Sequence, residues 1–252
     1  MADLTKDLIK SIETEEPVRL NKFLSDAGFC SRREADRFIE AGKVLVDGTV
    51  AIMGQKVTRT QSVTVDGKEI TSNNRLILLA YNKPVGVECT TAKENTDNII
   101  DKINYPERIY PVGRLDKNST GLILLTNTGE LVNQILKGSN YHEKEYIVKV
   151  DHPITEPFVH QMENGVVIKL EDGKKIAKTR QCQVFPIDKY TFSIILTQGL
   201  NRQIRRMCKA LGYEVKSLKR IRIMNIELKD LPLGKYRNVT ETELKVLLKS
   251  LS

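Results

Sequence analysis

An aspartate between two cations is the feature of this chain best suited to chemistry. Asp116 lies in the segment Gly113-Arg-Leu-Asp-Lys-Asn-Ser-Thr-Gly121, directly before the apolar run 122–126. The flanking Arg114 and Lys117 keep a carboxylate ionised, and a loop bracketed by glycines can present it to a cleft. A surface loop with ordinary ion pairs would explain the same charge pattern.

A second segment, 199–207, combines a helix start with guanidinium groups. Asn201 is expected to cap a helix over 201–211, with Arg202 and Arg205 three residues apart on one face. A helix N-terminus with added guanidinium groups is suited to binding phosphate or carboxylate. A solvated helix face is the alternative, and the apolar stripe of this helix is assigned to the core: Ile204, Met207 and Leu211.

Basic residues gather in the same part of the sequence. The chain of 252 residues has a formal net charge of +8, and residues 200–223 hold eight basic residues and one acid, a net charge of +7. A local positive field of this size favours a polyanion, of which phosphate is the commonest. A solvated basic surface is the other interpretation.

The elements that must position these groups are predicted to form a domain over 76–252. Apolar runs of strand length recur with short helical patterns between them: 76–81, 122–126 and 191–197 for the strands, and 130–136 and 156–162 for the helices. A capping box, Thr240–Glu243, opens a terminal helix. Because strands and helices do not alternate regularly, we predict an α+β fold with a mostly antiparallel mixed sheet flanked by helices.

A smaller α+β module is predicted over 17–73. Helical spacing at 20–27 ends before Gly28, and the capping box Ser31-Arg-Arg-Glu34 opens a second helix that runs to Gly42. Short strands at 43–46 and 63–65 each reach an Asp-Gly turn, as hairpins do. Residues 1–16 are expected to be a flexible leader, and Asn73 and Asn74 a linker.

The cysteines and histidines do not favour a metal site. The four cysteines are far apart and the three histidines have no ligand partners at metal spacing, so we expect reduced, structural thiols and no metal. No signal sequence or run long enough to span a bilayer is found, which predicts a cytoplasmic protein without a membrane partner.

Two weaker signals complete a pattern: Lys83-Pro-Val-Gly86, a turn after a strand, and Lys144-Glu-Tyr146, at the start of a strand. In order, Lys-Pro-x-Gly, Gly-Arg-Leu-Asp, Lys-x-Tyr and Arg-Gln-Ile-Arg-Arg-Met resemble the ribosomal RNA pseudouridine synthases of the RsuA/RluB/RluE/RluF type. The front module, from Arg19-Leu-Asn-Lys22 through Ser31-Arg-Arg-Glu-Ala35, resembles an S4-type RNA-binding domain. The segments 142–146 and 198–207 favour the RluF branch, which acts on large-subunit (23S) ribosomal RNA.

The resemblance implies a reaction and three catalytic roles. The N1–C1′ bond of uridine breaks, the base turns, and it rejoins the sugar through C5, with no cofactor. Asp116 is implied to be the essential carboxylate, Tyr146 to stack on the base and act in proton transfer, and Arg205 to pair with the carboxylate. Since the target atoms are unreachable in a paired helix, the uridine must be flipped into the pocket.

Contacts to the RNA are also expected. In the catalytic domain they are assigned to Lys83, Arg114, Leu115, Lys117, Asn201, Arg202, Gln203 and Arg206. In the S4-like module they are assigned to Arg19, Lys22, Arg32 and Arg33, which would grip phosphates and 2′-hydroxyls rather than read sequence. The module has a modest charge, so the strongest electrostatics are expected from residues 202–222.

Other functions fit parts of the chain. A non-catalytic S4-type ribosome assembly factor would explain the charge and the first domain, but not the ordered motifs of the second. A DNA-binding helix-turn-helix protein is disfavoured because hairpins follow its second helix. Several questions stay open: the target uridine, a transfer RNA loop as a further substrate, naked RNA or a ribosomal particle, an acylal or a glycal route, and the orientation of the S4-like module. We expect a monomer.

Overall fold

The computed structural model of the chain describes residues 16–58, 60–71, 76–91, 97–170 and 175–251. The predicted linker Asn73-Asn74 and, apart from Glu16, the predicted leader lie outside these residues. The chain forms two compact units, each described by itself: residues 1–77 with 105–110 and 126–129, and the remainder. The domain bounds predicted above, 17–73 and 76–252, stay a prediction.

The first unit packs two helices against short strands. Its main elements are β1 (Val18–Arg19), α2 (Leu20–Asp26), α3 (Arg32–Glu40), β2 (Val44–Val46), β3 (Thr49–Val50), β4 (Lys56–Val57), β5 (Val63–Val65) and β6 (Lys68–Glu69). The order β3-β2-β5-β6 gives a four-stranded antiparallel sheet, and β1 pairs with β4. One core joins both helices to the sheet, with Leu24, Ala35, Val44 and Val57 fully buried.

Local sequence signals are confirmed in this unit. Ser31 Oγ accepts a hydrogen bond from the Glu34 amide while the Glu34 carboxylate accepts one from the Ser31 amide, which makes the predicted capping box. Both Asp-Gly turns join antiparallel strands. Arg108, which is distant in sequence, closes the end of α2 because its guanidinium donates to Ser25 O and Cys30 O at 3.3 and 2.6 Å.

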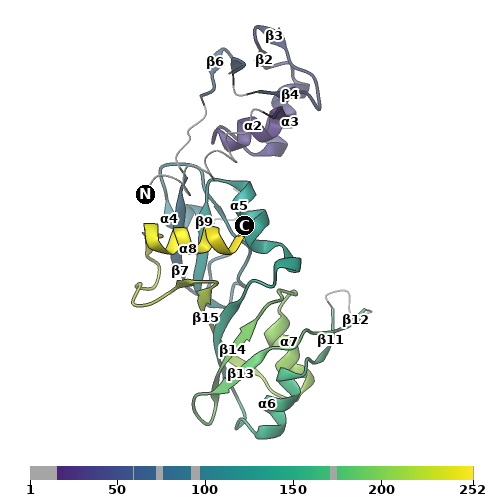
Figure 1. The fold of residues 1–252 in the computed structure, drawn as a ribbon, viewed down its shortest axis with the longest axis vertical. Helices are drawn as coiled ribbons and strands as arrows, with labels where there is room; N and C mark the ends of the chain where they lie inside the picture. The colour runs from purple at the N-terminus through teal and green to yellow at the C-terminus, as the bar shows by residue number, and fades with distance from the viewer. Residues whose placement is uncertain (1–15, 59, 72–75, 92–96, 171–174, 252) are drawn as a thin grey trace. The chain divides into compact units, whose positions relative to one another are not determined.

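The second unit is built on one mixed sheet (Figure 1), whose long path is β13-β14-β10-β15-β9-β7-β17. Its strands are β7 (Leu78–Lys83), β8 (Tyr110–Pro111), β9 (Thr120–Thr126), β10 (Lys144–Val150), β13 (Gln183–Pro186), β14 (Thr191–Leu196), β15 (Val215–Ile223), β16 (Ile226–Glu227) and β17 (Tyr236–Asn238). The other elements are α4 (Ile99–Ile103), α5 (Gly129–Leu136), the 3-10 turn η1 (Gly138–Asn140), α6 (Glu156–Glu163), α7 (Gln203–Ala210), α8 (Glu241–Leu251) and the hairpin β11 (Val167–Lys169) with β12 (Ile176–Lys178).

The predicted α+β class with a mostly antiparallel sheet is confirmed. Strand β10 is antiparallel to both of its neighbours, whereas β15 and β9 are parallel. Residues 122–125 of β9 are fully buried, as expected of a strand covered on both faces. The parallel pair needs Gly121, which has φ +102, because a Cβ there would lie 2.2 Å from Arg220 O.

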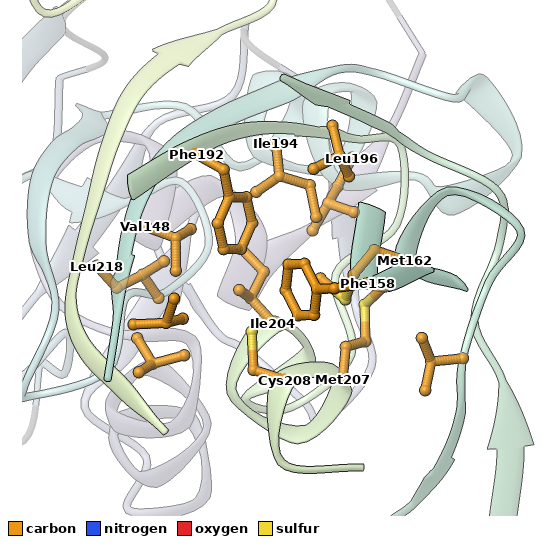
Figure 2. Close-up of a cluster of buried hydrophobic side chains, with 14 of the residues drawn as sticks. Val148, Phe158, Met162, Phe192, Ile194, Leu196, Ile204, Met207, Cys208 and Leu218 are labelled. Carbon is orange, nitrogen blue, oxygen red and sulfur yellow. The ribbon is translucent and has the colours of Figure 1, made fainter. Parts of the chain in front are cut away.

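Helices α6 and α7 cover one face of the β10–β14 part of the sheet. Figure 2 shows Phe158 and Met162 of α6 and Met207 of α7 meeting Phe192 and Ile194 of β14 in one apolar cluster. Each such side chain contributes about 1.5–3 kcal/mol when fully buried. This packing fixes α7, which begins directly after Arg202, against the sheet that includes the Tyr146 strand.

Among the described residues, no helix is both long and apolar enough to cross a membrane. The four cysteines are unpaired, and the described part of the chain holds no cluster of three potential metal ligands.

Candidate active site

The loop that carries Asp116 is held by backbone contacts on both sides. Asp116 O accepts from the Ser119 amide at 3.0 Å, and Lys117 O accepts from the Gly86 amide at 2.9 Å. The amide of Leu115 donates to the Cys89 thiol at 3.3 Å. The loop therefore joins the turn after β7 to the start of β9, and its carboxylate is presented with 27% of its side-chain surface exposed.

Two guanidinium groups converge on the carboxylate from the other side of the site. Arg202 NH1 and Arg205 Nε lie 3.6 and 3.7 Å from the same oxygen, Asp116 Oδ2. The two arginines differ in burial, because the Arg202 side chain is 46% exposed and that of Arg205 only 15%. They also differ in anchoring, since Arg205 donates to Asn118 O and Val215 O at 2.9 and 3.2 Å.

The orientation of Arg205 is informative. Its Nε is buried and meets no hydrogen-bond acceptor among the described residues, while the rest of the fork is engaged. Burial is the main cause that lowers the pKa of Arg205, the Arg202 charge lowers it further, and Asp116 opposes both. The contact between this Nε and Asp116 Oδ2, at 3.7 Å, is therefore an ion pair and not a hydrogen bond.

A cavity of about 570 Å³ opens beside this pair. It is lined by Glu88, Cys89, Thr90, Arg114, Leu115, Asp116, Lys117, Asn201 and Arg202. The volume is within the range of small-ligand pockets, and the charged residues of the lining are three basic and two acidic side chains. Such a cavity suits an anionic ligand with the bulk of a nucleotide.

Lys83, which was predicted to contact RNA, has a fully buried side chain in this structure. Its ammonium donates to Pro84 O and Val87 O at 2.8 Å and to Lys117 O at 3.4 Å, which uses three donors. Burial lowers its pKa, while the Cys89 thiol and Asp116 act in the opposite direction. Lys83 thus ties the turn after β7 to the Asp116 loop.

Tyr146 lies two strands from the segment that follows Asp116. In register, Tyr146 of β10 pairs with Arg220 of β15, and Arg220 pairs with Gly121 of β9. With strands about 4.8 Å apart, the Tyr146 and Gly121 backbones are about 10 Å apart. The Tyr146 ring is partly buried against the α6–α7 core, and Tyr146 is absent from the described lining of the cavity.

Arg220 was not singled out as a site residue from the sequence, yet it occupies the centre of this arrangement. It is 3% exposed, its Nε donates to Leu122 O at 2.6 Å, and its guanidinium carbon lies 5.9 Å from the Tyr146 ring centroid. Its NH2 has no hydrogen-bond partner within the described ranges. The charge of Arg220 and, above all, burial lower the pKa of Lys144 to about 8.

The start of α7 differs from the prediction. The helix begins at Gln203, and the residue at its N-cap is Arg202, with φ +51 and no side-chain cap. Asn201 does not cap it, because Asn201 Oδ1 accepts from Arg206 NH2 at 2.8 Å. The left-handed turn at Arg202 aims this side chain at Asp116 instead of along the helix.

Two further predicted RNA contacts are used within the protein. Gln203 is buried, and its Oε1 accepts from the Leu200 amide at 3.0 Å. The guanidinium of Arg206 donates to Lys169 O of β11 as well as to Asn201. Leu115 is also buried and enters the site only as part of the cavity wall, whereas Arg114 and Lys117 are exposed there.

The basic segment 200–223 does not form one free cationic surface. Arg220 is buried, Arg222 is paired with Glu143 and Glu145 at 3.0 and 2.9 Å, and Lys216 is paired with Glu214 at 2.7 Å. Arg220 is the only buried basic residue on β15, and Lys219 remains exposed. The expectation that the segment 202–222 dominates the RNA electrostatics stays a prediction. Arg202 is the member that reaches the cavity.

The four S4-like residues lie in the first unit. Arg19, Arg32 and Arg33 are exposed, and Lys22 forms an ion pair with Asp26 at 2.6 Å. Arg19 also lines a second cavity of about 210 Å³. Their roles in RNA binding stay predictions.

Residues that sequence reasoning missed surround the cavity on one side. Glu88, Cys89 and Thr90 line it, and Glu88 pairs with Lys117 at 3.0 Å. They follow the Lys-Pro-x-Gly turn, so their position two to four residues after Gly86 was the available signal. Burial raises the pKa of the Cys89 thiol, which acts here as an acceptor for the Leu115 amide.

Comparisons with known proteins show which family this chain resembles. A family model described as RNA pseudouridylate synthase matches residues 77–210, and one described as S4 domain matches residues 18–61. The dual-specificity RNA pseudouridine synthase RluF of Escherichia coli (strain K12) is 50% identical over 237 residues, which cover 93% of this chain and 80% of that protein. The ribosomal large subunit pseudouridine synthase B of Bacillus subtilis (strain 168) is 36% identical over 234 residues, covering 91% and 95%. A crystal structure of a pseudouridylate synthase matches with a TM-score of 0.66 and 27% identity, covering 91% of this chain and 99% of that one.

Proposed function

Because this chain belongs to the RNA pseudouridylate synthase family, we propose that it converts a uridine of large-subunit (23S) ribosomal RNA to pseudouridine with Asp116 as its catalytic carboxylate. One observation carries the assignment of the site. Arg202 and Arg205 bring two guanidinium groups to a single oxygen of Asp116 at the wall of a cavity of about 570 Å³.

The site residues have different roles in the proposed isomerisation. Asp116, paired with Arg205, acts on the sugar as the N1–C1′ bond breaks and the uracil leaves with the bonding electrons. The uracil turns, C5 forms the new bond to C1′, and the C5 proton is lost to solvent while the ring nitrogen gains one. Reactant and product have the same atoms, so the balance needs no co-reactant.

Tyr146 is proposed to stack on the flipped base and take part in the proton transfer. Its ring is held by the α6–α7 core on one side and by Arg220 in β15. An uncharged base that has left its helix gains stacking energy from such a ring. Arg114, Lys117 and Arg202, all exposed at the cavity, are proposed to hold the flanking phosphates.

The substrate class follows from the relatives. The names of the Escherichia coli and Bacillus subtilis proteins describe a dual-specificity RNA enzyme and a large-subunit enzyme. We propose large-subunit ribosomal RNA as the main substrate, with a transfer RNA loop to be tested as a second one. Action as a monomer, without a cofactor and in the cytoplasm, belongs to the same proposal.

The test uses RNA in which the uridines carry tritium at C5. The wild-type protein should release tritium from large-subunit ribosomal RNA, and Asp116→Asn should release none while its Kd for the RNA changes less than about three-fold. Tritium release by Asp116→Asn would remove Asp116 from its role. An inactive wild-type protein that still bound the RNA would favour the assembly-factor alternative.

A further inference from the structure

An aromatic ring stands exposed between η1 and β10, apart from the cavity described above. The side chain belongs to Tyr141, which is 59% exposed. The guanidinium carbon of Arg180 lies over this ring, 4.3 Å from its centroid. That distance is well within the range of a cation–π contact, so the ring has a defined neighbour on one side.

Arg180 is itself fixed by backbone groups. Its NH1 donates to Gly138 O at 3.0 Å and to Thr197 O at 3.3 Å. Its amide donates to Gln198 Oε1 at 3.0 Å. These bonds tie Arg180 to the turn before β10 and to the end of β14. They hold its guanidinium over one face of the Tyr141 ring, and the residue remains 59% exposed.

The backbone of Tyr141 is strained. Its φ is +53, in the left-handed region that glycine and asparagine adopt readily and that a bulky residue rarely adopts. Glycine or asparagine would form this turn with less strain, so the turn itself does not require a tyrosine. An exposed aromatic side chain at such a strained position points to use of the ring.

The ring belongs to segments that lead directly to the catalytic groups. Thr197, which accepts from Arg180, precedes Arg202 by five residues, so the two lie at most about 17 Å apart. Leu136, at the end of α5, packs on Gly113 at the start of the Asp116 loop. Three residues after Tyr141, strand β10 begins and carries Tyr146. The ring is therefore within a few nucleotides of a uridine bound at Asp116.

We infer that Tyr141 and Arg180 form a platform on which a base of the RNA strand stacks beside the target uridine, outside the catalytic cavity. The inference rests on the proposed function, because it presumes an RNA substrate at Asp116. Every base has a π-face, so an aromatic ring binds single-stranded or splayed bases with little sequence preference. The guanidinium and the exposed Lys137, four residues before the ring, supply charge for the adjoining phosphates.

The test compares three variants in RNA binding. Tyr141→Asn removes the ring but suits the left-handed backbone, and Tyr141→Phe keeps the ring. Tyr190→Ala is the matched control, because Tyr190 is also exposed, has Lys189 Nζ 5.5 Å from its ring centroid, and lies at the Val150 end of β10, away from Lys144. The probe is a transcript of the large-subunit ribosomal RNA, with Kd from filter binding and kcat and KM from tritium release.

We expect Tyr141→Asn to raise both Kd and KM about ten-fold, with kcat within about two-fold and Tm unchanged or higher. Tyr141→Phe and Tyr190→Ala should bind as the wild type does. A Kd unchanged by Tyr141→Asn would overturn the platform, as would an equal loss in Tyr141→Phe or Tyr190→Ala. If the wild-type protein releases no tritium, the proposed function fails; if it does and Tyr141→Asn binds equally well, only the platform fails.

Discussion

Arg202 and Arg205 offer a matched test of how the site holds its carboxylate. Each places a guanidinium nitrogen 3.6–3.7 Å from Asp116 Oδ2, so distance does not distinguish them. Burial and anchoring do, since Arg205 is the less exposed side chain and is bound to two carbonyl oxygens. Replacing each in turn by methionine removes the charge and keeps most of the bulk.

The expected magnitudes follow from the two environments. At 3.7 Å a unit charge pair is worth about 4 kcal/mol at an effective dielectric constant of about 20, and about 1 kcal/mol in bulk water. Arg205 lies nearer the first limit, with some screening because Asp116 is a quarter exposed, so about 2–4 kcal/mol is expected. Arg202 lies nearer the second, at about 1 kcal/mol or less. Arg205→Met should therefore lower kcat by about 30- to 1,000-fold, whereas Arg202→Met should lower kcat/KM by about five-fold or less.

Tritium release under single-turnover conditions, at low and high salt, separates the two variants. The loss caused by Arg205→Met should be largely independent of salt, because a buried pair is poorly screened. Arg202→Met should mainly raise KM, and the difference in KM between this variant and the wild type should disappear at high salt. Equal losses in kcat, or a larger loss from Arg202→Met, would refute the argument that burial decides the strength of the contact.

Three further substitutions test how the fold supports the site. Gly121→Ala should destabilise the protein by about 3 kcal/mol or more, measured by urea denaturation, because its Cβ would meet Arg220 O and its φ is +102; a near-neutral result would contradict the close β9–β15 approach. Lys83→Met should cost about 3 kcal/mol by leaving buried carbonyls unpaired, yet leave the salt slope of RNA binding unchanged; a slope reduced by about one would restore Lys83 as a phosphate contact. Glu243, paired with Arg237 at 2.7 Å, has its pKa lowered from 4.5 to about 2, mainly by that hydrogen bond. The stability that this ion pair contributes is present above pH 4.5 and is lost as the pH falls through about 2. Wild type should therefore be more stable than Glu243→Gln by about 1.5–3 kcal/mol near neutral pH, and thermal melts should show this difference vanish between pH 4.5 and 2. A difference that persists at pH 2 would exclude this cause.

Much of the framework was predicted from sequence because it depends on neighbouring residues. The capping boxes at Ser31 and Thr240 act over three residues, and both are present. The Asp-Gly turns and the strand that carries Tyr146 follow from local conformational preference and side-chain alternation. The Asp116 loop was also found in this way, since its glycines and flanking cations are adjacent in the chain.

Whether an individual polar side chain is buried or exposed depends on residues that are distant in the sequence. Lys83 is buried because Lys117, 34 residues away, offers a carbonyl, and Arg220 is buried because Leu122, 98 residues away, offers another. A cation in the sequence looks the same whether it meets a phosphate, a carboxylate or a buried carbonyl.

The sequence by itself therefore determined the family and the α+β class, and it predicted the carboxylate at position 116, since each depends on short runs of residues. Only the tertiary structure decided which arginines face that carboxylate, which basic residues are internal, and that Tyr141 meets Arg180. The physical reason is that burial and partnership depend on strands brought together from distant parts of the chain, and one turn, the left-handed residue Arg202, redirects a side chain that helical periodicity would have placed elsewhere.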